Sequence, residues 1–293
     1  MSTLNAAFIG LGTMGYPMAG HLAEAGISMT VYNRTAQRAQ QWTRDYPGSH
    51  APSPADAARH ADLVFICVGD DNDLRQVTLG DDGVMQTLAK GAVLVDHTTA
   101  SAEVARELDA ASRKQGSYFL DAPVSGGQQG AQNGQLSIMC GGDEATYQRV
   151  LPTLQHYGKA INLMGPAGSG QLTKMVNQIC VAGLVEGLAE GLAFALNAGL
   201  DANKVFETIS QGAAGSWQMV NRHQTMIDDQ YEHGFAVDWM RKDLDICLRE
   251  AVRNGTPLPI TEQINDFYRE IQSMGGGRWD TSSLLRRLQK IPT

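Results

Sequence analysis

Short apolar runs alternate with helix-like segments over residues 1–164. The runs are continuous and bounded by Gly, Pro or Asp, as expected for strands buried on both faces of a mostly parallel sheet. They predict strands at residues 6–9, 29–32, 63–68, 92–95, 118–120, 136–140 and 161–164. Between them, the pattern predicts helices at residues 16–25, 35–46, 102–115 and 143–157. We therefore expect a doubly wound α/β domain.

The pattern changes after a turn-rich junction that contains Gly165, Pro166, Gly168 and Gly170. Beyond this junction the sequence shows helical patterns and no convincing strand. We therefore predict two domains, an α/β domain at residues 1–164 and an all-α domain at residues 165–293. The second domain is expected to open with a long helix at about residues 171–198.

Small residues recur at every fourth position of that helix: Gly183, Gly187, Gly191, Ala195 and Gly199. A glycine inside a helix costs about 0.5–1 kcal/mol relative to alanine, so the row needs a compensating contact. We expect another backbone to pack closely against it, either from the first domain or from a partner subunit.

The same helix is apolar enough to raise the question of a membrane span. It carries Glu186 and Glu190 near its middle, and an ionised carboxylate is costly in lipid. We therefore interpret it as a buried helix of a soluble protein. Residues 1–7 lack the basic region of a secretory signal, so a cytoplasmic location is expected.

Charge and cysteine usage exclude several classes of function. The 23 Lys and Arg against 31 Asp and Glu give a net charge of −8, which disfavours general nucleic-acid binding. No metal-ligand cluster appears among the seven histidines, so no metal is expected. The cysteines form no CxxC pair and are interpreted as core or near-core thiols of a reducing compartment: Cys67, Cys140, Cys180 and Cys247.

A GxGxxG motif follows the first predicted strand and opens a helix, and comprises Gly10, Leu11, Gly12, Thr13, Met14 and Gly15. In this context Gly10 permits a tight turn, and Gly12 lets the backbone approach a pyrophosphate. Gly15 lets the helix lie close to the sheet. The motif predicts a Rossmann-type dinucleotide site. A purely structural glycine turn is the alternative.

The end of the second strand bears on the choice of cofactor. An NAD-selective enzyme usually places Asp or Glu here to bind the ribose 2′-hydroxyl. This chain has Asn33, Arg34 and Thr35, with no neighbouring carboxylate to repel a phosphate. Arg34 can pair with a 2′-phosphate, so NADP is expected over NAD. Alternatively, Arg34 is a solvated residue at a helix start.

Two further strand ends should border the cofactor, because ligands bind beyond the carboxyl ends of parallel strands. Cys67 and Val68 end the third strand and would border the adenosine and pyrophosphate. Thr98 and Thr99 follow the fourth strand and would meet the nicotinamide half. Ordinary loop chemistry explains these residues equally well.

A serine and two glycines follow another strand in Ser125, Gly126 and Gly127. Their hydroxyl and backbone N–H groups could hold a carboxylate, although a plain turn between strands fits too. Lys174 lies in the first turns of the long helix, with Asn177 and Gln178 on nearly the same side. Near a helix N-terminus the dipole disfavours its charge, which would suit proton transfer near neutrality.

Four segments together resemble the β-hydroxyacid dehydrogenase family, in family order and over nearly the whole chain. They are FIGLGTMGYPM at residues 8–18, DAPVSGG at 121–127, GQLTKMVNQ at 170–178 and KDL at 242–244. Members of the family include 3-hydroxyisobutyrate dehydrogenases, tartronate semialdehyde reductases and succinic semialdehyde/glyoxylate reductases.

The resemblance implies hydride transfer between NADP(H) and a small β-hydroxy acid or its semialdehyde. It implies that Lys174 is the general acid–base. It also implies that Ser125, Gly126 and Gly127 bind the substrate carboxylate.

By the same resemblance, Asn177 and Gln178 orient the substrate and the lysine. Many members carry a second Asn where this chain has Gln178, which is closer to the tartronate semialdehyde reductase pattern. Lys242 would close over the cofactor, and Trp217 would line the substrate pocket unless it is a core residue. The resemblance also implies a homodimer or homotetramer.

Three rival functions are weighed against this one. Imine reductases share the plan but typically lack the lysine, and 6-phosphogluconate dehydrogenases normally need a much longer chain. A non-catalytic NADP-binding module is disfavoured because Lys174, Ser125 and Asn177 are all retained. The substrate stays open among 3-hydroxyisobutyrate, serine, 4-hydroxybutyrate with succinic semialdehyde, glyoxylate and tartronate semialdehyde.

Overall fold

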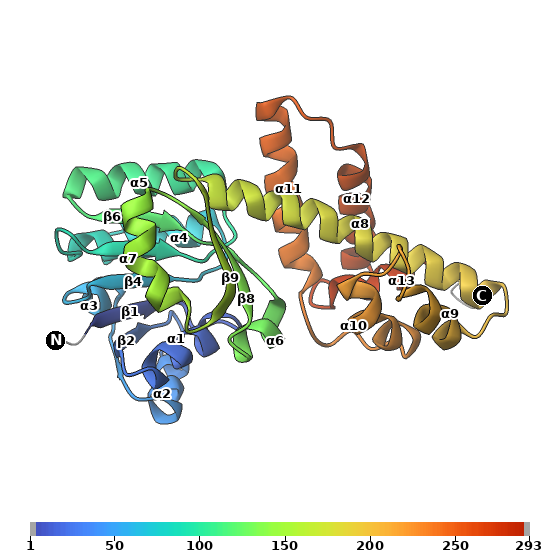
Figure 1. Cartoon of the computed structure of the whole chain (residues 1–293), viewed down its shortest axis with the longest axis horizontal. Helices are drawn as coiled ribbons and strands as arrows, with labels where there is room; N and C mark the ends of the chain where they lie inside the picture. The colour runs from blue at the N-terminus through green and yellow to red at the C-terminus, as the bar shows by residue number, and fades with distance from the viewer. Residues whose placement is uncertain (1–3, 290–293) are drawn as a thin grey trace. The chain divides into compact units, whose positions relative to one another are not determined.

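The computed structural model describes residues 4–289, and the chain divides into two compact units, Met1–Lys174 and Met175–Thr293. The first unit is a mostly parallel sheet flanked by helices, and the second is helical (Figure 1). The predicted fold class is therefore confirmed. The first unit includes the first turns of the long helix, which begins at Ser169.

The sheet has nine strands in the order β3-β2-β1-β4-β5-β6-β8-β7, with β9 paired to β8. The strands are β1 Asn5–Ile9, β2 Ser28–Tyr32, β3 Ser49–His50, β4 Leu63–Ile66, β5 Val93–Asp96, β6 Tyr118–Asp121, β7 Val124–Ser125, β8 Leu136–Gly141 and β9 Gly158–Gly165. All seven predicted strands are present. The prediction missed β3 and β7, because two residues are too few to show a periodicity.

The order of the parallel strands reverses beside β1, which pairs with β2 on one side and with β4 on the other. In open α/β sheets, such a switch point opens a crevice beyond the carboxyl ends of the strands, where ligands bind. The loop after β1, with its glycine motif, lies at this point.

The first unit contains helices α1 Gly15–Glu24, α2 Ala36–Asp45, α3 Pro54–Ala58, α4 Asp71–Leu79, α5 Ala102–Gln115, α6 Gly127–Gln132, α7 Glu144–Leu154 and the 3₁₀ turn η1 Val84–Gln86. The four predicted helices are among them. The prediction missed α3, α4 and α6, which are short or strongly polar. Each face of the sheet carries its own hydrophobic core, so alternate residues of β1, such as Phe8 and Ile9, belong to different clusters.

The second unit comprises most of α8 Ser169–Asn197, then α9 Ala202–Ile209, α10 Trp217–Ile227, α11 Val237–Asn254, α12 Pro259–Ser273, η2 Thr281–Ser283 and α13 Leu284–Leu288. Helices α11 and α12 run side by side in Figure 1. The turn between them is set by Gly255, in the left-handed region at φ 77°, and by Pro259 at the start of α12.

Helix α8 is buried along one side and exposed along the other. It is long and apolar enough to cross a membrane by length and composition, but only 39% of its most apolar window is buried. Val185, Leu188 and Leu192 of its buried side belong to the core of the second unit. Helix α8 is thus a core helix of the second unit along one side, as expected, and its opposite side is exposed.

Three of the small residues of α8 face open space. No described atom lies within 4 Å of a Cβ built at Gly183, Gly187 or Gly191. Ala195 is buried in the core, and Gly199 lies beyond the helix end with φ 72°. The expected close backbone contact is thus absent from the described part of this chain.

Candidate active site

The three glycines of the motif after β1 differ in the space around them. Gly10 has φ 95°, and a Cβ there would collide with the carbonyl of Cys67. A Cβ at Gly15 would collide with the carbonyl of Gly10, so α1 can approach the loop only with glycine. Gly12 faces open space, with nothing within 4 Å. The loop therefore has the shape of a dinucleotide cradle, with Gly12 where the ligand would approach.

The start of α1 is suited to an anion. Met14 at the N-cap provides no side-chain hydrogen bond, and the first turn has no acidic residue. The helix dipole and its N–H groups favour negative charge at such a place. Asn33, at the end of β2, holds the loop in position, because its Oδ1 accepts the Leu11 N–H at 2.9 Å. Its Nδ2 donates to the Thr35 carbonyl at 3.0 Å.

Arg34 is largely exposed, and its guanidinium pairs with the Asp73 carboxylate of α4 at 3.0 Å. The expectation that no carboxylate lies near Arg34 is therefore wrong. Asp73 is distant in sequence but adjacent in the fold. Arginine has five N–H donors, so this pair leaves donors for a further acceptor.

A second arginine, Arg38, was not predicted from the sequence and lies in the first turn of α2. The Arg38 guanidinium donates to the Leu11 carbonyl and stacks over the Tyr16 ring at 5.3 Å. With Thr13 and Thr35 it lines an open depression of about 610 Å³ beside the glycine loop. Its position four residues after Arg34, at the start of the predicted second helix, was the signal available in the sequence.

Hydrogen bonds join the carboxyl ends of β4 and β5. The Val68 N–H donates to Thr98 Oγ1 at 3.1 Å, and the Thr98 N–H donates to Asp96 Oδ1 at 2.9 Å. Thr98 is 1% exposed, so it ties the two strand ends together, whereas Thr99 is half-buried. Cys67 is also half-buried, with its carbonyl against Gly10.

Three buried titratable residues beneath this edge were not predicted as site residues. Burial raises the pKa of Asp96 to about 7 and the pKa of Asp121 to about 6. The neighbouring Asp121 charge adds to the shift of Asp96. Burial lowers the pKa of His97 to about 4, and its ring is held between the Ala122 carbonyl and the Tyr157 hydroxyl.

Ser125 ends β7, and the next two residues turn the chain into the short helix α6. Gly126 and Gly127 have φ values of 133° and 63°, which favour glycine. Ser125 is half-buried, while both glycines are exposed. The segment is thus a strand-to-helix turn with an accessible backbone, not a direct turn between strands.

Lys174 is a buried lysine, with 8% of its surface exposed. Lysine is almost never buried in this way without a specific environment. It lies in the second turn of α8, because that helix begins at Ser169. The helix dipole acts mainly within the first turn, so burial, not the expected dipole effect, distinguishes this lysine.

In the second unit, the residues after Lys174 join a polar chain with α11. Asn177 Nδ2 donates to Gln178 Oε1 at 2.7 Å, and Gln178 Nε2 donates to the Asp243 carboxylate at 2.6 Å. Asp243 is 1% exposed and forms an ion pair with Lys242 at 3.0 Å. The structure thus brings Asn177, Gln178 and Lys242 together through Asp243, which the sequence reasoning had not singled out.

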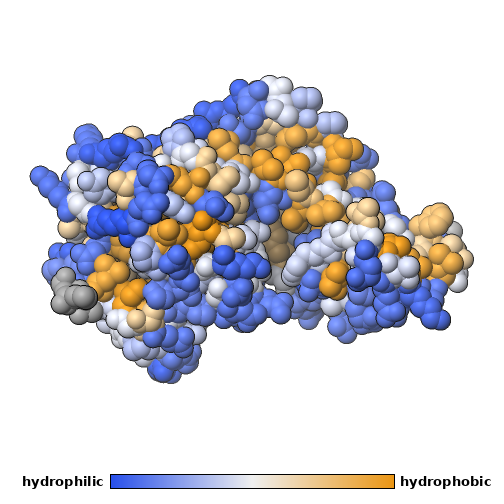
Figure 2. Space-filling model, viewed as in Figure 1, coloured by the Kyte–Doolittle hydropathy of each residue, from blue (hydrophilic) through white to orange (hydrophobic). Residues whose placement is uncertain are grey.

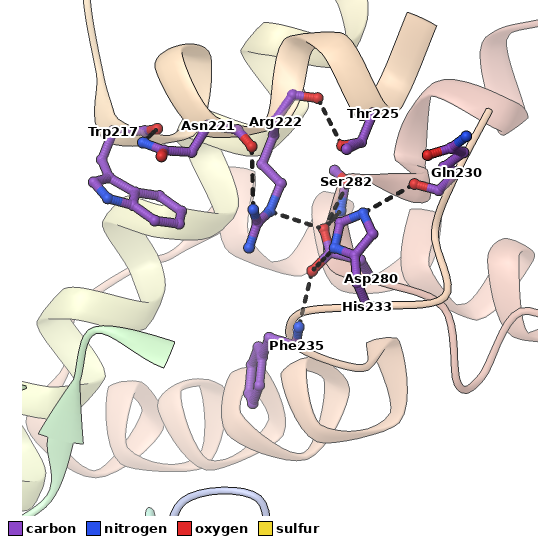
Figure 3. A network of polar contacts seen from close by, with 9 residues as sticks. All are labelled: Trp217, Asn221, Arg222, Thr225, Gln230, His233, Phe235, Asp280 and Ser282. Carbon is purple, nitrogen blue, oxygen red and sulfur yellow. Dashed lines mark hydrogen bonds and ion pairs between the residues drawn. The ribbon is translucent and has the colours of Figure 1, made fainter. Parts of the chain in front are cut away.

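Trp217 begins α10 and is 52% exposed, so the core alternative for it is wrong. The Arg222 guanidinium stacks over its indole ring at 5.0 Å and also pairs with Asp280 at 3.4 Å (Figure 3). Asp280 is buried and accepts the Phe235 N–H at 2.8 Å and the Ser282 hydroxyl at 2.6 Å. A rigid network therefore supports the exposed indole.

Among the residues that the structure describes, no group of three or more His, Cys, Asp or Glu side chains could hold a metal ion. Cys140 and Cys247 are buried and Cys67 is half-buried. Cys180 is exposed, because it lies on the open side of α8. The interpretation of Cys180 as a core or near-core thiol is therefore wrong.

Two family descriptions together match most of the chain. Residues 5–165 match the NAD-binding domain of 6-phosphogluconate dehydrogenase. Residues 168–288 match the NAD-binding family of NADP-dependent 3-hydroxyisobutyrate dehydrogenase. The chain belongs to the β-hydroxyacid dehydrogenase family.

Individual relatives of this β-hydroxyacid dehydrogenase agree with that assignment. An uncharacterized oxidoreductase of Shewanella frigidimarina is 60% identical, over 97% of this chain and 98% of its own length. A probable 3-hydroxyisobutyrate dehydrogenase-like mitochondrial protein of Arabidopsis thaliana is 41% identical, over 99% of this chain and 86% of its own length. The structure of Mycobacterium tuberculosis 3-hydroxyisobutyrate dehydrogenase with L-serine matches with a TM-score of 0.88 and 28% sequence identity. The match covers 98% of this chain and 100% of that chain. The protein is an NAD(P)-binding oxidoreductase.

Proposed function

We propose that this β-hydroxyacid dehydrogenase is NADP-preferring and interconverts a small β-hydroxy acid and its semialdehyde, with Lys174 as general acid–base. The observation that carries the proposal is the burial of Lys174 on a helix whose first turn is bonded to the ends of β5 and β6. A buried lysine beside the ligand-binding edge of a Rossmann sheet is suited to proton transfer.

The cofactor would be held by the glycine cradle. Gly10, Leu11, Gly12, Thr13, Met14 and Gly15 surround the start of α1, and the ends of β4 and β5 add Cys67, Val68, Thr98 and Thr99. When bound, the nicotinamide supplies or takes up the hydride. Since Thr98 is buried, direct contact with the nicotinamide half falls to Thr99 in this proposal.

The preference for NADP rests on the cationic end of β2. Arg34, Thr35 and Arg38 are exposed there, and Asn33 fixes the loop beside them. Both guanidinium groups can bind a 2′-phosphate through charge-assisted hydrogen bonds. NAD lacks that phosphate, so neither arginine would add to its binding affinity in this way.

In the reductive direction, Lys174 would donate a proton to the aldehyde oxygen of the substrate. In the oxidative direction, neutral Lys174 would accept the proton of the substrate hydroxyl. The hydroxyl of Ser125 and the N–H groups of Gly126 and Gly127 would hold the carboxylate. Fixing the substrate at this point can lower the activation barrier by an amount on the order of several kcal/mol.

Four further residues would take part in binding. Asn177 and Gln178 would orient the substrate and Lys174, Lys242 would close over the cofactor, and Trp217 would line the pocket. Gln178 is held by Asp243, so its orientation is fixed before a ligand binds. Candidate substrates are 3-hydroxyisobutyrate, serine, tartronate semialdehyde, succinic semialdehyde with 4-hydroxybutyrate, and glyoxylate.

We further propose a homodimer or homotetramer in which the open side of α8 meets the same side of a second copy. Val176, Leu184 and Phe194 are 61%, 45% and 73% exposed on that helix. The exposed Gly187 and Gly191 let two backbones approach closely, and a twofold axis makes such a surface self-complementary. Apolar patches are visible on this helical part in Figure 2. A cytoplasmic location, without nucleic-acid or membrane partners, completes the proposal.

A spectrophotometric panel at about 340 nm tests the activity, with NADPH or NADH against the semialdehydes and NADP⁺ or NAD⁺ against the hydroxy acids. We expect one acid–semialdehyde pair to turn over with NADP preferred. Lys174→Ala should abolish turnover and leave NADPH binding, followed by fluorescence, unchanged. Lys159→Ala, at an exposed lysine of β9, is the matched control and should behave as wild type.

The alternative functions give different outcomes in the same panel. An imine reductase-like enzyme would bind NADPH and reduce cyclic imines, while the semialdehydes stay inert. A non-catalytic NADP-binding module would bind NADPH and turn over neither class. Full turnover by Lys174→Ala would remove the proposed role of the lysine.

A further inference from the structure

Asp121 opens the segment 121–127 but has no role in the proposed function. It is the last residue of β6 and is fully buried. Its Oδ1 accepts the Gly168 N–H at 2.7 Å, and its Oδ2 accepts the Gln171 N–H at 2.9 Å. These donors flank the first two residues of α8, so the carboxylate is bonded to the start of the helix that carries Lys174.

Two glycines make this contact possible. A Cβ at Gly141 would lie 2.5 Å from Asp121 Oδ1, and a Cβ at Gly170 would lie 2.8 Å from Asp121 Oδ2. Both distances are shorter than any ordinary carbon–oxygen contact. The start of α8 therefore lies directly against the carboxylate, with no side chain and no space between them.

The side chain of Gln171 makes a second attachment of the same turn. It is fully buried, and its Nε2 donates to the Thr98 carbonyl at 2.7 Å. Its Oε1 accepts the Ala100 N–H at 3.1 Å. One residue of α8 is thus tied by its backbone to the end of β6 and by its side chain to the loop after β5.

The attachment to Asp121 is charged at neutral pH. Burial raises the pKa of Asp121 to about 6, while backbone N–H groups of Gly168, Gln171 and Gly170 oppose the rise. A carboxylate that accepts several N–H groups forms short, strong hydrogen bonds. Lys174 follows Gln171 by three residues, so it lies on the same side of α8 and about 4.5 Å further along the axis.

We propose that Asp121 is a positioning residue for Lys174. Together with Gln171 it fixes both the axis and the rotation of the first turns of α8 against the strand ends, and so places the lysine amine at the reacting oxygen. This inference rests on the proposed function, in which Lys174 exchanges the proton. A misplacement of about 1 Å can cost about 100-fold in rate.

Two variants and one control test the proposal in the full-length enzyme. Asp121→Asn keeps the size but turns one acceptor into a donor that faces an N–H group. Gln171→Met removes the bonds to Thr98 and Ala100 at similar volume. The control is Asp143→Asn, because Asp143 caps α7 in the same way, accepting the Thr146 N–H at 2.9 Å, but lies outside the site.

We expect Asp121→Asn and Gln171→Met each to lower kcat at least about 10-fold, with NADPH affinity within about 3-fold of wild type. The ratio of kcat in H₂O to kcat in D₂O should rise in both, because a misplaced lysine makes proton transfer slower. Partial unfolding alone would lower kcat in proportion to the NADPH-binding fraction and leave that ratio unchanged. Asp143→Asn should keep kcat and the ratio.

The outcomes separate this inference from the function on which it rests. If Lys174→Ala abolishes turnover but both variants keep the wild-type kcat and isotope ratio, the positioning role is overturned and the proposed function stands. If Lys174→Ala retains turnover, both are overturned. Should Asp121→Asn fail to fold, Gln171→Met decides alone by the same two readouts.

Discussion

Asp96 and Asp121 are direct neighbours at the carboxyl ends of the adjacent parallel strands β5 and β6, and both are fully buried. Asp96 Oδ2 has no hydrogen-bond partner among the described residues. Two carboxylates this close to each other resist ionising together. The edge of the sheet that carries the proposed site therefore contains a pair of acids whose protonation depends on pH near neutrality.

This pair predicts that the stability of the fold falls as pH rises. The folded-state pKa of Asp96 is raised to about 7, so its contribution to stability is fully present below its ordinary pKa of 3.8. That contribution is lost as pH rises through 7. Asp96→Asn removes the penalty on the ionised form, which is about 1.4 kcal/mol for each pKa unit.

The measurement is the free energy of unfolding in urea at pH values of about 5 and about 8. From the lower to the higher pH, the free energy of unfolding of Asp96→Asn should rise relative to that of wild type by at least about 1 kcal/mol. Asp81→Asn, at an exposed aspartate, should follow the wild-type curve. Parallel curves for Asp96→Asn and wild type would show that Asp96 does not titrate in this range.

Arg34 and Asp73 should act on cofactor choice in opposite directions. Arg34→Ala removes a donor for the 2′-phosphate and should weaken NADPH binding about 10-fold or more, with NADH unchanged. Asp73→Asn releases Arg34 from a surface ion pair and should strengthen NADPH binding by up to about 5-fold. The dissociation constants for both cofactors are measured by fluorescence. Arg59→Ala, which breaks the exposed pair with Asp56, is the control and should change neither constant. Equal effects of Arg34→Ala on NADH and NADPH binding would refute the 2′-phosphate role.

Gly10 and Gly12 should respond differently to alanine. Gly10→Ala places a Cβ against the Cys67 carbonyl in a left-handed conformation and should lower the melting temperature by several degrees. Gly12→Ala meets open space and should leave the melting temperature unchanged, but weaken NADPH binding about 10-fold or more. Melting curves and NADPH titrations of both variants decide the matter. Unchanged binding by Gly12→Ala would remove the assigned pyrophosphate position.

Gly187→Leu should disrupt assembly and leave the fold of each subunit intact, because Gly187 faces open space. Light scattering after size exclusion should show a smaller species, with an unchanged circular dichroism spectrum. Gln263→Leu, at an exposed position of α12, controls for added apolar surface and should keep the wild-type size. A monomeric wild-type chain, or an unaltered oligomer in Gly187→Leu, would contradict the proposed interface.

The features that the sequence predicted well are local. The glycine motif, the preceding strand and the following helix all lie within a few residues, and Gly12 faces open space there, as the proposed approach of the cofactor requires. The longer strands of the sheet show apolar runs for the same reason. Segments β7 and α6 were missed because two residues or a glycine-rich turn carry no periodicity.

The features that the sequence missed depend on contacts between distant residues. The bonds from Asp121 to Gly168 and Gln171 span 47 and 50 positions, and the Arg34–Asp73 pair spans 39. No pattern along the chain encodes such pairings. The sequence therefore identified Lys174 as a candidate, whereas only the fold shows what holds its helix in place.

The exposed thiol of Cys180 would give the proposed oligomer an intrinsic reporter of its assembly. Cys180 lies on α8, four residues after Val176 and four before Leu184, while Cys140 and Cys247 are buried. A maleimide dye added to native protein should therefore label this position first. The labelling rate, measured as the protein is diluted, will report how much of the surrounding apolar surface is exposed to solvent. This measurement needs no engineered tag.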